Sequence, residues 1–255
     1  MKRINTARAL PSALAAVAVL LVACGNDQTP AGRADAQKPT TPTTQATDSR
    51  DFVLLLDDDT HPDQVEGKPG WYAMTARGMA KPPLAVVDVP AGFTNFGFFA
   101  LWPEDSAHSS DPFRGIQYWT VYAVHKNPCR SMKGPTQIGD SVGELADALA
   151  AQKLTSATKP EPVSLDGHDG VYLELTMPTG IDFETCDQGY FFLWDAKPGD
   201  AHHTADSPGL VERLWILDVD GDRVVLAAAA GVDNSAAEID ELTAIAESVR
   251  FVRAN

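Results

Sequence analysis

The chain has 255 residues, of which 44% are hydrophobic, and a formal net charge of −15 at pH 7. This length and apolar content are sufficient to bury one large core or two small ones. The negative charge would repel phosphate backbones, which argues against nucleic acid as a partner and favours solubility.

The N-terminus has the pattern of a secretory signal. Lys2, Arg3 and Arg8 provide a basic flank, and an apolar stretch extends over residues 9–23. This stretch is shorter than the ~20 residues that a helix needs to span a bilayer. A short apolar segment after basic residues is typical of a signal peptide, and we expect one over residues 1–23.

The apolar stretch ends in L-V-A-C, and its cysteine is Cys24. This ending resembles the lipobox of bacterial lipoproteins, in which the cysteine becomes the lipid-modified N-terminus. The resemblance implies a diacylglyceryl group, usually with an added N-acyl chain such as palmitate, and two or more chains anchor a protein stably. A buried cysteine in an ordinary apolar helix is the alternative. We expect a lipoprotein on the extracytoplasmic face of the cell membrane.

Residues 24–50 contain no aromatic residue and no periodic apolar pattern. Such a segment cannot bury enough surface to offset its chain entropy, so we expect a flexible tether after the lipidated cysteine. The tether would hold the folded domain on the order of 30 Å from the lipid. A single globular domain is expected over residues 51–255.

Eight segments of the domain have the composition of β-strands, because they are rich in aromatic and β-branched residues and are bounded by Gly, Pro and Asp. Consecutive strands with few helices between them favour an antiparallel sheet. The expected strands are Gly70–Thr75, Leu84–Val89, Asn95–Trp102, Gly115–Val124, Val171–Thr176, Gly189–Trp194, Arg213–Asp218 and Arg223–Ala229.

Two segments, Asp140–Gln152 and Ser235–Val249, have apolar residues at helical spacing. Each opens with a capping box, in which a serine and a glutamate three residues later satisfy backbone donors reciprocally. The two pairs are Ser141 with Glu144 and Ser235 with Glu238. We therefore predict the α+β class, with one antiparallel β-sheet flanked by these two main helices.

Aromatic residues cluster on two of the expected strands. Because adjacent strand residues face opposite ways, some of them must point away from a one-sided core. A sheet covered on both faces, one by each helix, accounts for this pattern, and an apolar pocket or partner surface is the alternative. The residues are Tyr118, Trp119 and Tyr122 in one strand, and Tyr190, Phe191, Phe192 and Trp194 in the other.

Two cysteines remain in the domain, Cys129 and Cys186. An even number of cysteines in an exported protein predicts a disulfide between them. Free thiols or half of a metal site are the alternatives, but neither cysteine belongs to a C-x-x-C motif.

Ser141 lies in Gly139–Gly143, which matches the G-x-S-x-G pattern of hydrolase nucleophile elbows. That motif requires a buried strand before the serine, and the preceding K-G-P-T-Q-I is not one. We therefore interpret Ser141 as a helix cap.

The histidines have ordinary interpretations as well. His202 and His203, flanked by Asp200 and Asp206, could donate metal ligands, but adjacent histidines rarely face one site and their segment resembles an exposed loop. His168 lies between glycines in a predicted hairpin turn.

Two acidic stretches could hold Ca²⁺. Asp57–Asp59, with His61 and Asp63, is expected to be a solvated turn, with a weak Ca²⁺ site as the alternative. Asp218–Asp222 does not fit a calcium loop, because no frame places glycine at position 6 together with ligands at positions 1 and 12. Its Asp-Gly pair is the dipeptide preferred in a type I′ hairpin turn, so we predict a hairpin.

Three segments, residues 163–176, 213–230 and 235–251, form a hairpin, a strand passing through a D-G turn, and a last helix. This pattern resembles the close of a PsbP-like or LpqN-type domain and covers about residues 140–253. The resemblance implies a small α+β domain with a helix-flanked antiparallel sheet. It also implies an accessory or binding role, because these domains share no catalytic set.

The sequence thus predicts a lipid-anchored, extracytoplasmic binding or accessory protein of the cell envelope that is not an enzyme and needs no cofactor or metal. Its expected partners are the membrane, through the anchor on Cys24, and an envelope protein or lipid ligand. The first alternative is an envelope hydrolase that uses Ser141 or a metal held by histidines and aspartates. The second is a structural envelope protein.

Overall fold

The computed structural model describes residues 52–56, 64–105 and 113–253. The predicted signal peptide, Cys24, the tether and the acidic stretch at Asp57–Asp59 lie outside these residues. Among the helices in the described part of the chain, none is long and apolar enough to cross a membrane.

The predicted α+β class is wrong, because strands hold 44% of the described residues and helices only 16%. The described residues form three sheets, and the two α-helices, α1 (Val142–Ala150) and α2 (Ala236–Glu247), are short. A capping box is a strong local signal for a helix, whereas the packing of one sheet on another depends on strands far apart in the chain. Two smaller sheets therefore perform much of the covering role that was predicted for the helices.

The central sheet has eight strands, and all of its neighbouring strands pair antiparallel. Its order is β10-β11-β14-β15-β6-β5-β4, with β9 paired to β11. The bounds are β4 (Phe93–Phe96), β5 (Ala100–Pro103), β6 (Arg114–Trp119), β9 (Ser156–Ala157), β10 (Glu161–Leu165), β11 (His168–Thr176), β14 (Val211–Val219) and β15 (Asp222–Ala230).

Two four-stranded sheets accompany the central one. The first has the order β1-β2-β3-β16, and only its β1–β2 pair is parallel. The second, which we call the histidine sheet, has the order β13-β12-β7-β8. The bounds are β1 (Val53–Leu54), β2 (Gly70–Thr75), β3 (Leu84–Val89), β7 (Ala123–Val124), β8 (Thr136–Gln137), β12 (Phe191–Lys197), β13 (Asp200–Ala205) and β16 (Arg250–Val252).

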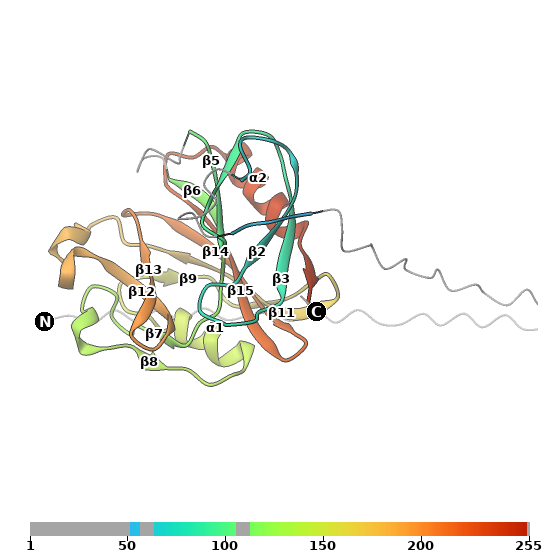
Figure 1. Ribbon diagram of the computed structural model, residues 1–255. Helices are drawn as coiled ribbons and strands as arrows, with labels where there is room; N and C mark the ends of the chain where they lie inside the picture. Colours follow the sequence, from blue (N-terminus) through green and yellow to red (C-terminus); the bar gives the residue numbers. More distant parts are fainter. Residues whose placement is uncertain (1–51, 57–63, 106–112, 254–255) are drawn as a thin grey trace, which may run out of the picture. The chain divides into compact units, whose positions relative to one another are not determined.

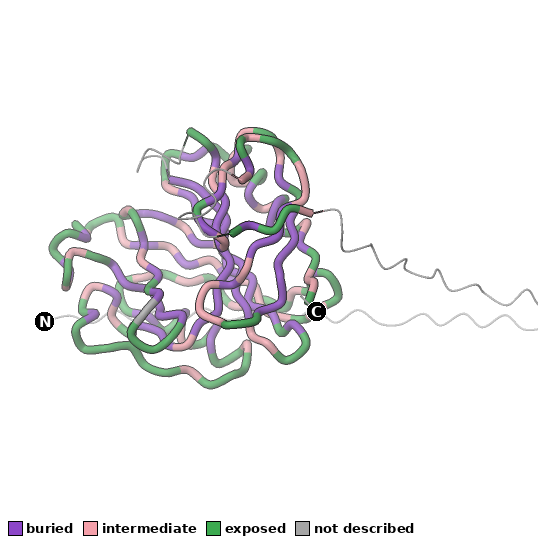
Figure 2. The backbone as a smooth tube through the Cα atoms, in the orientation of Figure 1, coloured by how far each residue is buried: buried purple, intermediate pink, exposed green. Residues whose placement is uncertain are grey.

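The two large core clusters lie on opposite faces of the central sheet, and a third, smaller one is formed by Ala73, Leu84 and Val86. Figure 1 shows the elements that supply them, and Figure 2 shows where the chain is buried. On one face, strands β2 and β3 and helix α2 pack against the sheet, and on the other face β12, β13 and α1 do so. Strand β15 contributes to both large clusters, because successive side chains point to opposite faces. Its residues Val224, Leu226, Ala228 and Ala230 enter the first cluster, and Val225, Ala227 and Ala229 enter the second.

Both predicted helices and both capping boxes are confirmed. Six of the eight expected strands correspond to single strands, but the other two each divide. Asn95–Trp102 forms parts of the hairpin β4–β5, which turns at Gly97 with a positive φ of 59°. Gly115–Val124 supplies β6 to the central sheet and β7 to the histidine sheet. A continuous run of residues that favour strands does not reveal where a chain changes sheets.

The predicted disulfide between Cys129 and Cys186 is confirmed. It links two loops that contain three short 3-10 helices, Ser131–Lys133, Phe183–Thr185 and Asp187–Gly189. The amide of Asp187 donates to the carbonyl oxygen of Cys129 at 3.1 Å, and the amide of Phe192 donates to that of Pro128 at 3.0 Å. The disulfide thus ties the segment that follows β7 to the segment that enters β12.

The acidic turn at Asp218–Asp222 is the predicted hairpin, which joins β14 to β15. Asp220 and Gly221 have positive φ values of 54° and 91°, as a type I′ turn requires. The Asp218 carboxylate accepts the Gly221 amide at 2.7 Å, and the guanidinium of Arg253 pairs with Asp220 and Asp222. The three carboxylates thus interact with an amide and a guanidinium of the protein itself, and these interactions stabilise the turn.

Candidate histidine and aspartate site

The adjacent residues His202 and His203 were predicted to lie in an exposed loop, and this is wrong. Both belong to β13, which pairs with β12 along a hairpin. Their segment has few apolar residues, so its strand structure comes from the partner strand and not from its own composition. Because neighbouring strand residues alternate, His202 points to the outer face of the histidine sheet and His203 points into the core.

On the outer face, one carboxylate oxygen meets two histidines. The Oδ1 atom of Asp195 lies 2.7 Å from Nδ1 of His202 and 3.0 Å from Nε2 of His125. His202 is the direct cross-strand partner of Asp195, and His125 follows strand β7 on the other side of β12. The three donor atoms all lie within 4.8 Å of one another. We call this group the outer cluster.

A register shift in β12 orients the cluster. The pairing of β12 with β13 is irregular between Phe192 and Trp194, which lets Phe192 and Asp195 share the outer face although three positions separate them. The Phe192 ring lies 5.5 Å from the ring of His125 and 5.4 Å from that of His202. It therefore restricts both imidazoles beside the carboxylate.

The outer cluster is open to solvent on one side only. The side chains of His125 and Asp195 are 5% and 4% exposed, whereas that of His202 is 43% exposed. The Nδ1 atom of His125 is buried and has no hydrogen-bond partner among the described residues. A buried carboxylate between two imidazole nitrogens is a group that can bind a cation or exchange protons.

The second histidine of the hairpin, His203, is buried in the core beside a carboxylate. Nε2 of His203 lies 2.7 Å from Oε1 of Glu212, and the two side chains are only 5% and 1% exposed. The imidazole packs against two tryptophans, with ring centroids 4.1 Å from Trp194 and 5.0 Å from Trp119. We call this pair the inner pair.

Ser141 has the structural role that the sequence analysis gave it. Its hydroxyl donates to Oε2 of Glu144 at 2.7 Å and accepts the Glu144 amide at 3.2 Å. The hydrogen bond from the serine hydroxyl is the main cause of a lowered pKa for the Glu144 carboxyl. In the part of the chain that the structure describes, no histidine hydrogen-bonds to Ser141, so these residues form no nucleophile–base pair.

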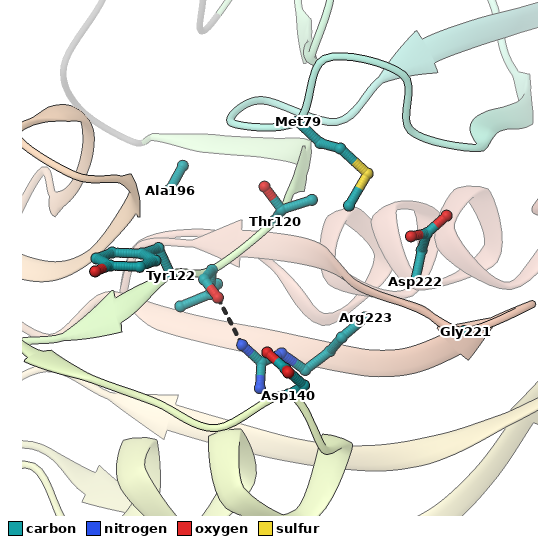
Figure 3. A pocket seen from close by; sticks show the side chains of 9 residues that line it. Met79, Thr120, Tyr122, Asp140, Ala196, Gly221, Asp222 and Arg223 are labelled. Carbon is teal, nitrogen blue, oxygen red and sulfur yellow. Dashed lines mark hydrogen bonds between the residues drawn. The ribbon is translucent and has the colours of Figure 1, made fainter.

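A pocket of about 260 Å³ lies near the start of α1 (Figure 3). Met79 lines one side of the pocket, and Arg223 and Asp140 lie together on the opposite side. The guanidinium of Arg223 donates to the carbonyl oxygens of Val121 at 2.7 Å and Ser141 at 3.0 Å. Burial lowers the pKa of Arg223, and the charge of Asp140 partly opposes this effect. The arginine thus holds the start of the helix to the sheet. Because Arg223 already has this structural role, the outer cluster is the stronger candidate for a functional site.

No protein-family model matches this chain, and a search of curated proteins finds no match either. The resemblance to PsbP-like or LpqN-type domains therefore remains a prediction from the sequence pattern.

The structure separates the residues that the sequence analysis grouped. His168 begins β11 beside the confirmed hairpin turn at Asp166–Gly167, and its ring packs on Phe251 at 5.5 Å. His202 joins the outer cluster, but its partners Asp195 and His125 were not singled out. The one sequence signal for Asp195 is its position directly after the aromatic segment Gly189–Trp194. A charged residue that is buried beside such a segment needs a polar partner.

Proposed function

We propose that this protein is a lipoprotein of the cell envelope, anchored through Cys24 on the extracytoplasmic face of the cell membrane. In this proposal it acts as a non-catalytic binding or accessory protein, with an envelope protein or lipid as its partner. The observation that carries the proposal is the surface of the disulfide-linked loops, which presents Met132 at 78% and Tyr190 at 57% exposure.

Export is supported by two independent features. The first is the sequence pattern that ends at Cys24. The second is the disulfide between Cys129 and Cys186, since such bonds persist in oxidising compartments and are rare in the cytosol.

A binding role is supported by the surroundings of the exposed side chains. Met132 and Tyr190 flank the disulfide, and the Tyr190 ring lies 5.9 Å from Phe192, which contacts the outer cluster. Exposed apolar side chains held by a rigid covalent link are suited to contact a partner, because little side-chain or loop entropy is lost on binding. The engagement of Ser141 in a helix cap supports a non-catalytic role over the serine hydrolase alternative.

The test is site-specific photo-cross-linking in cells that express the full chain. A photoreactive residue at position 190 should give a discrete adduct, whereas the same residue at Val232, which is 67% exposed elsewhere, should not. Cys24→Ala should release the protein from the membrane fraction or leave its signal uncleaved. The proposal fails if position 190 gives no adduct, or if the Cys24→Ala protein stays processed and membrane-bound.

A further inference from the structure

We infer that the outer cluster is a binding site for a divalent transition-metal ion such as Zn²⁺, held by Nε2 of His125, Oδ1 of Asp195 and Nδ1 of His202. This inference goes beyond the proposed function, because it concerns a small ligand of the folded domain and requires neither the anchor nor a protein partner.

The donor atoms have the type that this class of ion prefers. Two imidazole nitrogens and one carboxylate oxygen suit zinc and its neighbours in the first transition series. Ca²⁺ and Mg²⁺ instead favour sites built from oxygen ligands alone. The ligand set therefore selects a transition metal over the alkaline-earth ions.

The donor separations are close to those of a metal site. Zinc–nitrogen and zinc–oxygen bonds of about 2.0–2.2 Å at tetrahedral angles place ligand atoms roughly 3.4 Å apart. The two hydrogen-bonded separations are 2.7 and 3.0 Å, and all three donor atoms lie within 4.8 Å. A metal ion that replaces the two hydrogen bonds lengthens these separations by roughly 0.4–0.7 Å and draws the two imidazole nitrogens, which lie within 4.8 Å of each other, toward the same spacing.

The site is also preorganised. His125 and Asp195 are buried, and the Phe192 ring contacts both imidazoles. The disulfide at Cys129 ties the segment after His125 to the segment that leads into β12. Two of the three ligands are thus positioned before an ion arrives, and the third lies on the strand paired with β12.

The exposure of His202 defines the character of the site. Its side chain is 43% exposed, so the fourth coordination position would face solvent. Three protein ligands with one open position are typical of zinc sites that exchange or activate a bound molecule, whereas structural sites are closed by four protein ligands. The ion would therefore exchange with the surrounding solution.

The test is isothermal titration of the full chain, purified in detergent and stripped of metal with EDTA, which is then removed. Zinc chloride should bind with one ion per chain at this cluster, and the visible spectrum of a Co²⁺ complex should show tetrahedral coordination. His202→Gln should weaken zinc binding by more than about 100-fold, since even the partners of metal ligands contribute about 10–100-fold. Excess Ca²⁺ should not compete.

His168→Gln is the matched control, because it removes a histidine from another sheet and should leave the affinity unchanged. Asp195→Asn is a second variant that removes a proposed ligand with little change of shape, and it should also weaken zinc binding. If Asp195→Asn does not fold, His202→Gln still tests the inference. The inference is overturned if the wild-type chain does not bind zinc, if His202→Gln binds it equally well, or if Ca²⁺ displaces it. A failed anchor or cross-linking experiment leaves this result unaffected, so the two proposals can fail separately.

Discussion

The two faces of the β12–β13 hairpin hold similar groups in opposite environments. On the outer face the imidazole of His202 is 43% exposed beside Asp195, whereas on the inner face that of His203 is 5% exposed beside Glu212. Both histidines lie 2.7 Å from a buried carboxylate oxygen. The same chemical pair therefore serves as a candidate binding site in one case and as part of the core in the other.

This difference shows that access decides the role of a histidine–carboxylate pair. The inner pair is almost completely buried, and its imidazole packs against Trp119 and Trp194. The outer cluster has a third ligand, His125, and a solvent-facing side. Variants on the two faces should therefore separate stability from metal binding.

The largest effect should come from breaking the inner pair. His203→Ala should lower the free energy of unfolding by about 3–5 kcal/mol, because it leaves the Glu212 carboxyl buried without its partner. The loss of ring packing against the two tryptophans adds to this effect. Chemical denaturation of the purified chain measures the change. A replacement of both residues by leucine should recover much of the stability, and a loss below about 1 kcal/mol in His203→Ala would contradict the assignment.

A slightly smaller loss of unfolding free energy should follow removal of the disulfide, which joins the loops before β12 and after β7. Its cysteines are separated by 57 positions, and closing a loop of that size contributes about 4 kcal/mol in the chain-entropy model. Replacing Cys129 and Cys186 by serine should lower the denaturation midpoint by a corresponding amount. The wild-type protein in excess reductant should match the double variant, and equal stability of the oxidised and reduced forms would refute this role.

The smallest effect should be that of His202→Gln on the metal-free protein. The side chain is 43% exposed and Asp195 keeps its hydrogen bond to His125, so the free energy of unfolding should change by less than about 1 kcal/mol. The same denaturation assay measures it. If this variant is as unstable as His203→Ala, the outer cluster is part of the core and the distinction between the faces is wrong.

Features that depend on neighbouring residues were predicted well. The capping boxes at Ser141 and Ser235 lie within one helical turn, and both helices formed where they were expected. The Asp220–Gly221 turn is determined by the conformations that its two residues tolerate. The disulfide was predictable because only Cys129 and Cys186 remained as partners in the domain.

The fold class was wrong because it required knowledge of what covers each sheet. Strand β15 is apolar from Val224 to Ala230, and the sequence cannot tell whether helices or other strands bury its two faces. The split of Gly115–Val124 between two sheets was missed for the same reason, since aromatic and β-branched residues continue across the change.

The sequence by itself determined the acidic charge, the lipoprotein-like pattern at Cys24, the helix caps, the hairpin turns and the cysteine pair, because each depends on composition or on a few neighbouring residues. Only the tertiary structure decided that His125, Asp195 and His202 meet. They lie on three segments of the chain. The register shift in β12 determines that Asp195 lies on the same face of the histidine sheet as Phe192 and His202. Strand register and sheet pairing are long-range properties, and a shift of one residue moves a side chain to the opposite face.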